Sequence, residues 1–358
     1  MIYEDYYIFT PGPVKMSEEI LKIGAIQTPY FRNSEFSDVT FFCENSLLGM
    51  LNAPKGSRVI FLTASGTAGM ESVVMNLLDS DDNALVVNGG GFGQRFVDVC
   101  AVHNVSHFDF KVEDTNLSDI KTKAPNEKFS SLIVNAHETS VGHIYDLSAL
   151  GEYCKENNLF YIVDAISMFV TDEIDMQKQN IDTVIISSQK GLALPPGLTM
   201  VVLSPKALAK IKDVKNLYFN FKDYLRNGER GQTPYTPAVT IMLQLQKRLE
   251  QIEKDGGIEK SIEKAKDLAE YFREKIKPLP LKAYSDFMPN AMTTLTPTDG
   301  KSAFKIVEDL EERYKIMVCP NGGELRDTIF RVSHMGDMDR AYVDVLVDAL
   351  FDYYEKEA

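Results

Sequence analysis

Residues 183–203 read TVIISSQKGLALPPGLTMVVL, and this stretch decides the fold class. It begins and ends with short apolar runs, Thr183–Ser187 and Thr199–Leu203, whose β-branched residues are typical of strands buried on both faces of a sheet. Lys190 follows the first run, and the turn residues Pro195-Pro196-Gly197 precede the second. Because ligands of open α/β sheets bind beyond the carboxyl ends of the strands, Lys190 stands where a ligand is expected.

Four similar runs lie upstream and alternate with helical patterns. Apolar residues recur at helical spacing from Met70 to Leu78, and residues 94–103 and 147–157 also predict helices. Strands that alternate with helices form a layered α/β domain, in which a mostly parallel sheet has helices on both faces. The sequence therefore predicts this fold class, with further strands at Arg58–Leu62, Ala84–Val87, Ser131–Val134 and Leu159–Val163.

The character of the chain changes after Pro237, where a Lys- and Glu-rich amphipathic stretch runs to Ile276 with Gly256-Gly257 as its clear interruption. Single cores stop growing at roughly 250 to 300 residues. For a chain of 358 residues we therefore expect an N-terminal segment (1–15), a large domain (16–250) and a small C-terminal α+β domain (251–358). The small domain is expected to contain strands at Leu281–Ser285, Ala291–Thr296, Ile316–Cys319 and Thr328–Val332, and helices at Ala303–Tyr314 and Met338–Tyr354.

Composition and charge exclude several functions. A formal net charge of -14 argues against general affinity for nucleic acid or anionic membranes, which attract clustered Lys and Arg. The four cysteines are scattered without a CxxC pair, so neither a metal site nor a disulfide framework is indicated. No run of about 18 apolar residues occurs. We expect a cytoplasmic protein with reduced thiols that acts on small molecules, without nucleic acid, membrane or metal.

Ser65-Gly66-Thr67 follows a predicted strand and opens a helix. Small residues there let backbone N–H groups approach an anion, and the helix dipole favours negative charge, so a phosphate group fits this position. A plain helix cap with glycine turns explains the segment equally well.

Asp164 ends a very apolar strand that contains Ile162 and Val163. A buried carboxylate is costly unless a cation or hydrogen-bond donors accompany it. A lysine at the position of Lys190 can form an imine with a carbonyl compound. Taken singly, a capping role for Asp164 and a surface position for Lys190 are the simpler interpretations, so the case for a site rests on the combination of the three motifs.

In this order and spacing, the three motifs resemble those of the class V aminotransferase family, whose members are fold type I enzymes that depend on pyridoxal phosphate (PLP). Within it, the sequence is most similar to the alanine/serine-glyoxylate (or pyruvate) and the 2-aminoethylphosphonate-pyruvate transaminases. The resemblance covers nearly the whole chain. The other matching segments are Thr10–Val14, Phe31–Phe36, Gly91–Arg95, His137–Gly142, Ser188–Lys190, Thr233–Pro237 and Phe330–Gly336.

The resemblance implies a role for each matching residue. Lys190 would form the Schiff base with PLP and carry the proton that moves during transamination, and Asp164 would keep the pyridine nitrogen protonated. Phe92 would stack on the ring. The remaining cofactor contacts would be Ser65, Gly66, Thr67 and Gln189 at the phosphate end and Thr139 at the ring.

The resemblance also implies how substrate and a second subunit bind. Arg331 matches the arginine that grips the substrate carboxylate with a bidentate fork. Thr233 and Tyr235 resemble residues that reach the phosphate bound by the neighbouring subunit, which implies a homodimer with shared active sites. The segment Thr28–Arg32 departs from the His-Arg pair of many relatives, so the substrate pocket is expected to differ from theirs. If the donor is an aminophosphonate, Arg32 is a candidate helper of Arg331 in binding the phosphonate.

The expected activity is transfer of an amino group from a small donor, of the alanine or serine type, to a 2-oxo acid such as pyruvate or glyoxylate. A 2-aminoethylphosphonate-pyruvate transaminase is the alternative within this class. A cysteine desulfurase or lyase on the same fold is a further alternative, because desulfurases use a C-terminal cysteine. Cys319 lacks the preceding His of that motif, so we expect it to be a partly buried structural thiol.

Overall fold

The computed structural model describes residues 5–112, 120 and 128–356. Within these residues, the centre is a seven-stranded sheet with the order β2-β10-β9-β8-β5-β3-β4. Neighbouring strands are parallel from β9 to β4, whereas β10 is antiparallel to both β2 and β9. The prediction of a mostly parallel α/β sheet is confirmed. Its strands are β2 (Arg58–Leu62), β3 (Asn83–Asn88), β4 (Ser106–Lys111), β5 (Ser131–Asn135), β8 (Phe160–Asp164), β9 (Thr183–Ser187) and β10 (Thr199–Leu203).

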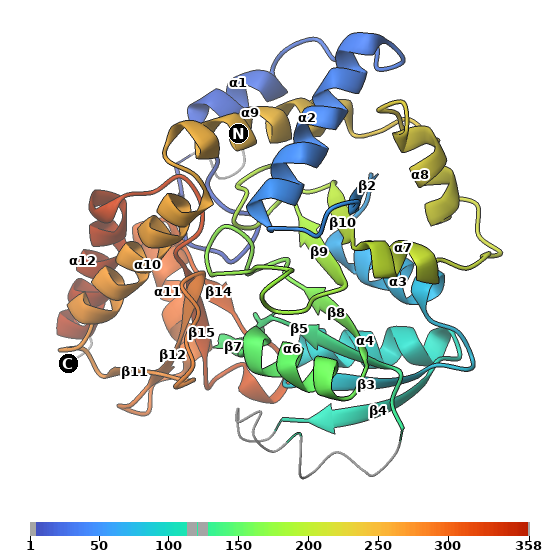
Figure 1. Cartoon of the computed structure of the whole chain (residues 1–358). Helices are drawn as coiled ribbons and strands as arrows, with labels where there is room; N and C mark the ends of the chain where they lie inside the picture. The colour runs from blue at the N-terminus through green and yellow to red at the C-terminus, as the bar shows by residue number, and fades with distance from the viewer. Residues whose placement is uncertain (1–4, 113–119, 121–127, 357–358) are drawn as a thin grey trace.

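Helices cover both faces of this sheet (Figure 1). Consecutive strand residues point to opposite faces, and in β8 Tyr161 and Val163 belong to one core while Phe160 and Ile162 belong to the other. Because both faces are buried, the strands are apolar throughout. Residues of α2 (Ser34–Met50), α6 (Leu147–Glu156) and α9 (Val239–Lys254) complete the first core, and those of α3 (Gly66–Leu77), α4 (Gly91–Val102), α7 (Pro205–Lys210) and α8 (Phe221–Gly228) the second.

The C-terminal part contains an antiparallel sheet with the order β11-β12-β15-β14, which shares a core with α10, α11 and α12. The beginning of the chain joins this part, because β1 (Tyr7–Ile8) pairs with β13 (Ile316–Met317) and Phe9 lies in the same core. The domain boundaries at residues 15 and 250 remain predictions. The other elements are β11 (Leu281–Ala283), β12 (Met292–Pro297), β14 (Cys319–Pro320), β15 (Phe330–Ser333), α10 (Ile258–Lys275), α11 (Ala303–Tyr314) and α12 (Arg340–Lys356).

The observed strands differ from the sequence prediction in several places: the short strands β1, β6 (His137–Glu138) and β7 (His143–Ile144) were not predicted, and two further differences have a clear physical reason. Strand β4 was not expected because its sequence, SHFDFK, is polar, as suits a partly exposed strand at the edge of the sheet. The segment Ile316–Cys319, expected as one strand, divides between β13 and β14, which belong to different sheets. The interruption predicted at Gly256-Gly257 does separate α9 from α10, and both glycines have positive φ angles, of 104° and 92°.

Short elements complete the described chain. They are α1 (Glu18–Gly24), the two-stranded pair β6 (His137–Glu138) and β7 (His143–Ile144), and a 3-10 turn at Gly323–Leu325. In the ranges that the structure describes, no helix combines the length and apolar character needed to cross a membrane.

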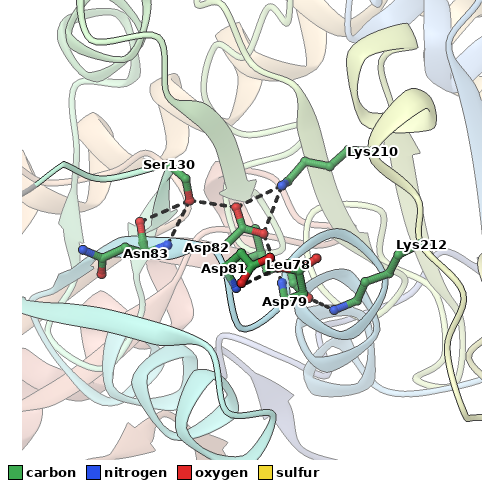
Figure 2. A network of polar contacts seen from close by, with 8 residues as sticks. All are labelled: Leu78, Asp79, Asp81, Asp82, Asn83, Ser130, Lys210 and Lys212. Carbon is green, nitrogen blue, oxygen red and sulfur yellow. Dashed lines mark hydrogen bonds and ion pairs between the residues drawn. The ribbon is translucent and has the colours of Figure 1, made fainter.

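Asp82 joins three segments at the amino ends of β3 and β5, as Figure 2 shows. Its carboxylate accepts hydrogen bonds from Ser130 Oγ at 2.8 Å, Lys210 Nζ at 3.0 Å and the backbone N–H of Asp79 at 3.0 Å. Nearby, Lys212 Nζ donates to the carbonyl oxygen of Leu78. Burial acts to raise the pKa of Asp82, but the hydrogen bonds from Ser130 and Lys210 outweigh it and lower the pKa below its usual value.

Asp82→Ala should lower the free energy of unfolding by about 1–3 kcal/mol, because three donors lose their acceptor. The matched control is Asp81→Ala, at the exposed neighbouring residue, with an expected change within about 0.5 kcal/mol. Urea unfolding measures both variants. Because the folded-state pKa of Asp82 is lowered, the difference from wild type should be full above about pH 4 and should shrink as the pH falls further. Equal losses in the two variants would contradict the role of the network.

Candidate active site

Asp164 is the last residue of β8 and is 1% exposed. Asn135 ends the neighbouring strand β5 in register with it, and Asn135 Nδ2 donates to Asp164 Oδ2 at 2.8 Å. The backbone N–H of Ile166 donates to the other oxygen, also at 2.8 Å. Burial raises the pKa of Asp164 to about 6, although both hydrogen bonds and the charge of Lys190 act in the opposite direction. The site therefore holds a fixed carboxylate that a bound cation would stabilise further.

Lys190 lies just beyond β9, the strand beside β8, and is 9% exposed. Burial lowers the pKa of Lys190 to about 8, and the charge of Arg331 acts in the same direction, while Asp164 and Cys319 oppose it. The N-terminal segment covers the side chain closely, because a Cβ atom at Gly12 would lie 2.7 Å from Lys190 Cδ. A substantial fraction of this amine is neutral near pH 8, which suits a nucleophile.

The N-terminus of α3 faces the ends of β8 and β9. A Cβ atom at Gly66 would lie 2.5 Å from Ile166 Cδ1 and 3.5 Å from Ser187 Cβ, so a larger residue here would force the Ile166 side chain to move. Gln189 lies at the same end of β9, where its Oε1 accepts a hydrogen bond from Ser187 Oγ at 2.6 Å. The structure therefore brings the predicted phosphate contacts Gly66 and Gln189 to one side of the strand that precedes Lys190.

The first turn of α3 has the properties of an anion site. Ser65 occupies the N-cap position, but within the described structure its side chain makes no capping hydrogen bond. Thr67 Oγ1 accepts a hydrogen bond from Arg95 Nη1 at 3.0 Å, which places a guanidinium beside this helix end. Since the first backbone N–H groups of a helix lack intrahelical acceptors, a phosphate group can take their place.

Phe92 stands in the first turn of α4, which Glu138 caps from β6. The Glu138 carboxylate accepts hydrogen bonds from the backbone N–H groups of Phe92 at 3.2 Å and Gly93 at 2.9 Å. The guanidinium of Arg95 lies over the Phe92 ring, 4.8 Å from its centroid. Glu138 thus fixes the turn that carries the predicted stacking residue.

Thr139 is buried, and its Oγ1 lies 2.8 Å from Ser167 Oγ. His137 is held by the same residue, with Nδ1 3.3 Å from the carbonyl oxygen of Ser167. Burial lowers the pKa of His137 to about 3, so the ring is neutral at physiological pH. The sequence analysis missed Ser167, because no motif marks a serine three residues after Asp164; only the fold brings it to Thr139.

Arg331 lies in β15 and connects the C-terminal part to the large part of the chain. Its Nη1 donates to the carbonyl oxygen of Thr139 at 3.1 Å, and its Nη2 donates to that of Pro320 at 2.8 Å. Nη2 is also 3.0 Å from Cys319 Sγ, because Cys319 is directly opposite Arg331 in the antiparallel pair of β14 and β15. Nε is buried and has no hydrogen-bond partner among the described residues. Cys319, expected to be only structural, therefore contacts the predicted carboxylate-binding group.

Thr233 and Tyr235 lie in a separate cluster of contacts within this chain. Arg32 donates to the carbonyl oxygens of Thr233 at 2.9 Å and Pro234 at 3.2 Å. Tyr235 stacks on Tyr218, with ring centroids 5.4 Å apart. Arg32 is thus engaged in holding this segment, which does not favour its predicted use as a phosphonate helper, and the contact with a second subunit remains a prediction.

The chain matches the family described as "Aminotransferase class-V" over residues 30–331 and belongs to that family. It is 30% identical over 340 residues to the soluble hydrogenase 42 kDa subunit of Anabaena cylindrica, with 92% of this chain and 88% of that protein covered. It is 24% identical over 348 residues to the L-aspartate–glyoxylate aminotransferase of Paracoccus denitrificans, with 93% and 87% covered.

A solved structure agrees in fold. The aspartate aminotransferase of subgroup IV from Thermus thermophilus superposes with a TM-score of 0.89 at 24% identity, over 98% of this chain and 99% of that one. At this identity the likeness shows the fold alone, and the fold is that of the fold type I aminotransferases. Family and fold together make the protein a PLP-dependent aminotransferase, as the sequence analysis expected.

In the cofactor-free protein, Lys190 should titrate near pH 8, because burial and the charge of Arg331 lower its pKa. Asp164→Asn should lower that pKa further, since the variant loses a negative charge that favours the ammonium form. Competitive labelling with acetic anhydride over roughly pH 6 to 11, followed by peptide mapping, measures both effects. Lys275 is an internal control, because a hydrogen bond with Tyr271 raises its pKa. The same titration midpoint for Lys190 and Lys275 would refute the electrostatic account.

Proposed function

We propose that the protein transfers an amino group from a small donor, of the alanine or serine type, to a 2-oxo acid such as pyruvate or glyoxylate. The observation that carries the proposal is that Arg331 Nε is buried and has no hydrogen-bond partner among the described residues. The charge of the Arg331 guanidinium lowers the pKa of Lys190, so the two groups lie close together. A carboxylate bound to Arg331 would therefore lie near the Lys190 amine. The name of the Paracoccus relative, which includes glyoxylate, supports an oxo acid of this size as the acceptor.

Three features of the described residues fit PLP. The buried Asp164, with a pKa of about 6, suits the N–H of a pyridinium ring. The uncapped first turn of α3 suits the phosphate group, and Lys190, with a pKa of about 8, suits an aldehyde carbon. When bound, PLP supplies a ring that withdraws electrons from the carbon atom that loses and regains a proton.

Each residue then has a defined task. Lys190 Nζ accepts the proton from the substrate Cα, because much of the amine is neutral near pH 8, and later returns a proton. Arg331 orients the substrate carboxylate with parallel hydrogen bonds. Asp164, fixed by Asn135 and Ile166, stabilises positive charge at the ring nitrogen. The N-terminal segment at Gly12 packs against the Lys190 side chain and keeps water from it.

Homodimeric assembly and a cytoplasmic location belong to the same proposal. Arg32 donates hydrogen bonds to the carbonyl oxygens of Thr233 and Pro234 and so fixes the conformation of this segment. A fixed segment supports the proposal that it reaches a second subunit. All four cysteines are free, and three of them are buried, which suits a reducing compartment.

A half-reaction screen tests the function. Purified holoenzyme is mixed with alanine, serine, aspartate, 2-aminoethylphosphonate or cysteine, and conversion of the cofactor to its amine form is followed by absorbance. We expect conversion with an amino acid and its reversal by glyoxylate or pyruvate. Conversion with 2-aminoethylphosphonate alone would support the alternative substrate class, and sulfide release from cysteine without conversion would refute transamination. Borohydride reduction and peptide mapping should place the cofactor on Lys190, with the exposed Lys266 as the unlabelled control.

Arg331→Lys should raise the KM for the 2-oxo acid and for the amino-acid donor together, by about tenfold or more, because lysine keeps the charge but loses the fork. Cofactor absorbance should stay unchanged. Steady-state kinetics of both half-reactions measures the effect. Unchanged KM values would show that Arg331 has only a structural role between Thr139 and Pro320, and KM values that shift by different factors would favour an aminophosphonate donor.

A further inference from the structure

Helix α9 ends and α10 begins between the large and the C-terminal parts of the chain (Figure 1). Two adjoining clefts are lined by residues around this junction. Their volumes are about 360 and 310 Å³. Arg248 of α9, Lys264 of α10, Asp255 and Gly336 line both of them. The smaller cleft extends to Gly191, the residue after Lys190, but its lining includes none of the residues predicted to contact PLP or substrate.

Arg248 brings an unsatisfied cation to these clefts. Its Nε is buried and has no hydrogen-bond partner among the described residues. Burial lowers the pKa of Arg248, and Asp255 and Asp337 oppose this effect only by electrostatic attraction. Asp337 is itself engaged with Lys15, at 3.2 Å. Arg248 is only partly buried, but its buried Nε leaves one donor of the charged group unsatisfied, so a bound anion would stabilise this position.

His334 adds a second unpartnered donor to the smaller cleft. Thr293 Oγ1 accepts a hydrogen bond from Arg273 Nε at 2.9 Å and lies 2.8 Å from His334 Nε2. Among the described residues that nitrogen is the one acceptor within reach of the hydroxyl hydrogen, so we assign the Thr293 hydroxyl as the donor to it. Burial holds the pKa of His334 well below its usual value, and the neutral ring therefore carries its proton on Nδ1. That Nδ1 is buried and, in the described part of the chain, without a partner.

The charges that line the smaller cleft are mainly positive. Arg248, Lys260 and Lys264 face one carboxylate, that of Asp255. Lys260 is paired with Glu263 at 2.6 Å, whereas no ion pair of Lys264 occurs within the described ranges. Ser261 adds a hydroxyl group to the same lining. Arginine and lysine with neighbouring N–H and O–H donors form the usual surroundings of a phosphate group.

We infer that the smaller cleft binds a phosphate group, held by Arg248 and Lys264 with the Nδ1–H of His334 as a further donor. The site is separate from the phosphate position predicted at α3, because its residues come from α9, α10 and the segment after β15. A phosphate group here would contact the large part through Arg248 and the C-terminal part through Lys264 and His334. Free phosphate and a phosphate monoester share the chemistry that this site recognises.

Isothermal titration of PLP-saturated holoenzyme with inorganic phosphate tests the inference, against chloride at equal ionic strength. We expect saturable binding to wild type, weakened by about tenfold or more in Arg248→Gln and in Lys264→Gln. Lys264 is exposed, so its variant tests the site even if Arg248→Gln fails to fold. The matched control is Lys266→Gln, on the same helix and paired with Glu270 at 3.8 Å, which should bind as wild type does.

Arg331→Lys separates this cleft from the candidate active site and should leave phosphate affinity unchanged. Loss of binding in Arg331→Lys, with binding retained in Lys264→Gln, would place the anion at the substrate position and overturn the inference. Absence of saturable binding to wild type would overturn it as well. Glycerol 3-phosphate, titrated in parallel, identifies which of the two ligands the cleft binds. Tighter binding than that of inorganic phosphate indicates a phosphate monoester, and equal binding indicates free phosphate.

Discussion

The burial of a carboxylate and an amine at the carboxyl ends of two adjacent parallel strands is the constraint on which the rest of this structure depends. Asp164 ends β8, and Lys190 follows the neighbouring strand β9. Burial raises the pKa of Asp164 and lowers that of Lys190, which in each case favours the neutral form. Removing such groups from water is costly unless donors or opposite charges accompany them. Asn135 and the backbone of Ile166 supply part of that compensation, and the cofactor of this family supplies an aldehyde and a ring nitrogen suited to the rest.

The same constraint explains why distant segments converge here. The N-terminal segment passes over Lys190 so closely that Gly12 has no room for a Cβ atom, and β1, which precedes Gly12, pairs with the C-terminal part of the chain. Arg331 extends from β15 to the carbonyl oxygen of Thr139 in the large part. The candidate site therefore includes residues from both parts, and its geometry depends on how they pack against each other.

Sequence patterns predicted the strands of the large sheet well, because a strand buried on both faces is apolar at nearly every position. They missed β4, whose edge position leaves it polar, and they merged β13 with β14, because the sequence does not reveal where a chain passes from one sheet to another. Motifs along the chain made Lys190, Asp164 and Arg331 the predicted site residues. Ser167 and the contact of Cys319 with Arg331 had no such signal, since both arise from pairing across the fold.

By itself, the sequence determined the fold class, the family and the residue types available for chemistry, because local apolar runs, turn residues and ordered motifs are encoded along the chain. Only the tertiary structure decided the electrostatic state of those residues. The lowered pKa of Lys190, the raised pKa of Asp164 and the unpartnered nitrogens of Arg331, Arg248 and His334 all follow from burial among segments far apart in sequence. Desolvation depends on which atoms surround a group in space, and linear spacing does not contain that information.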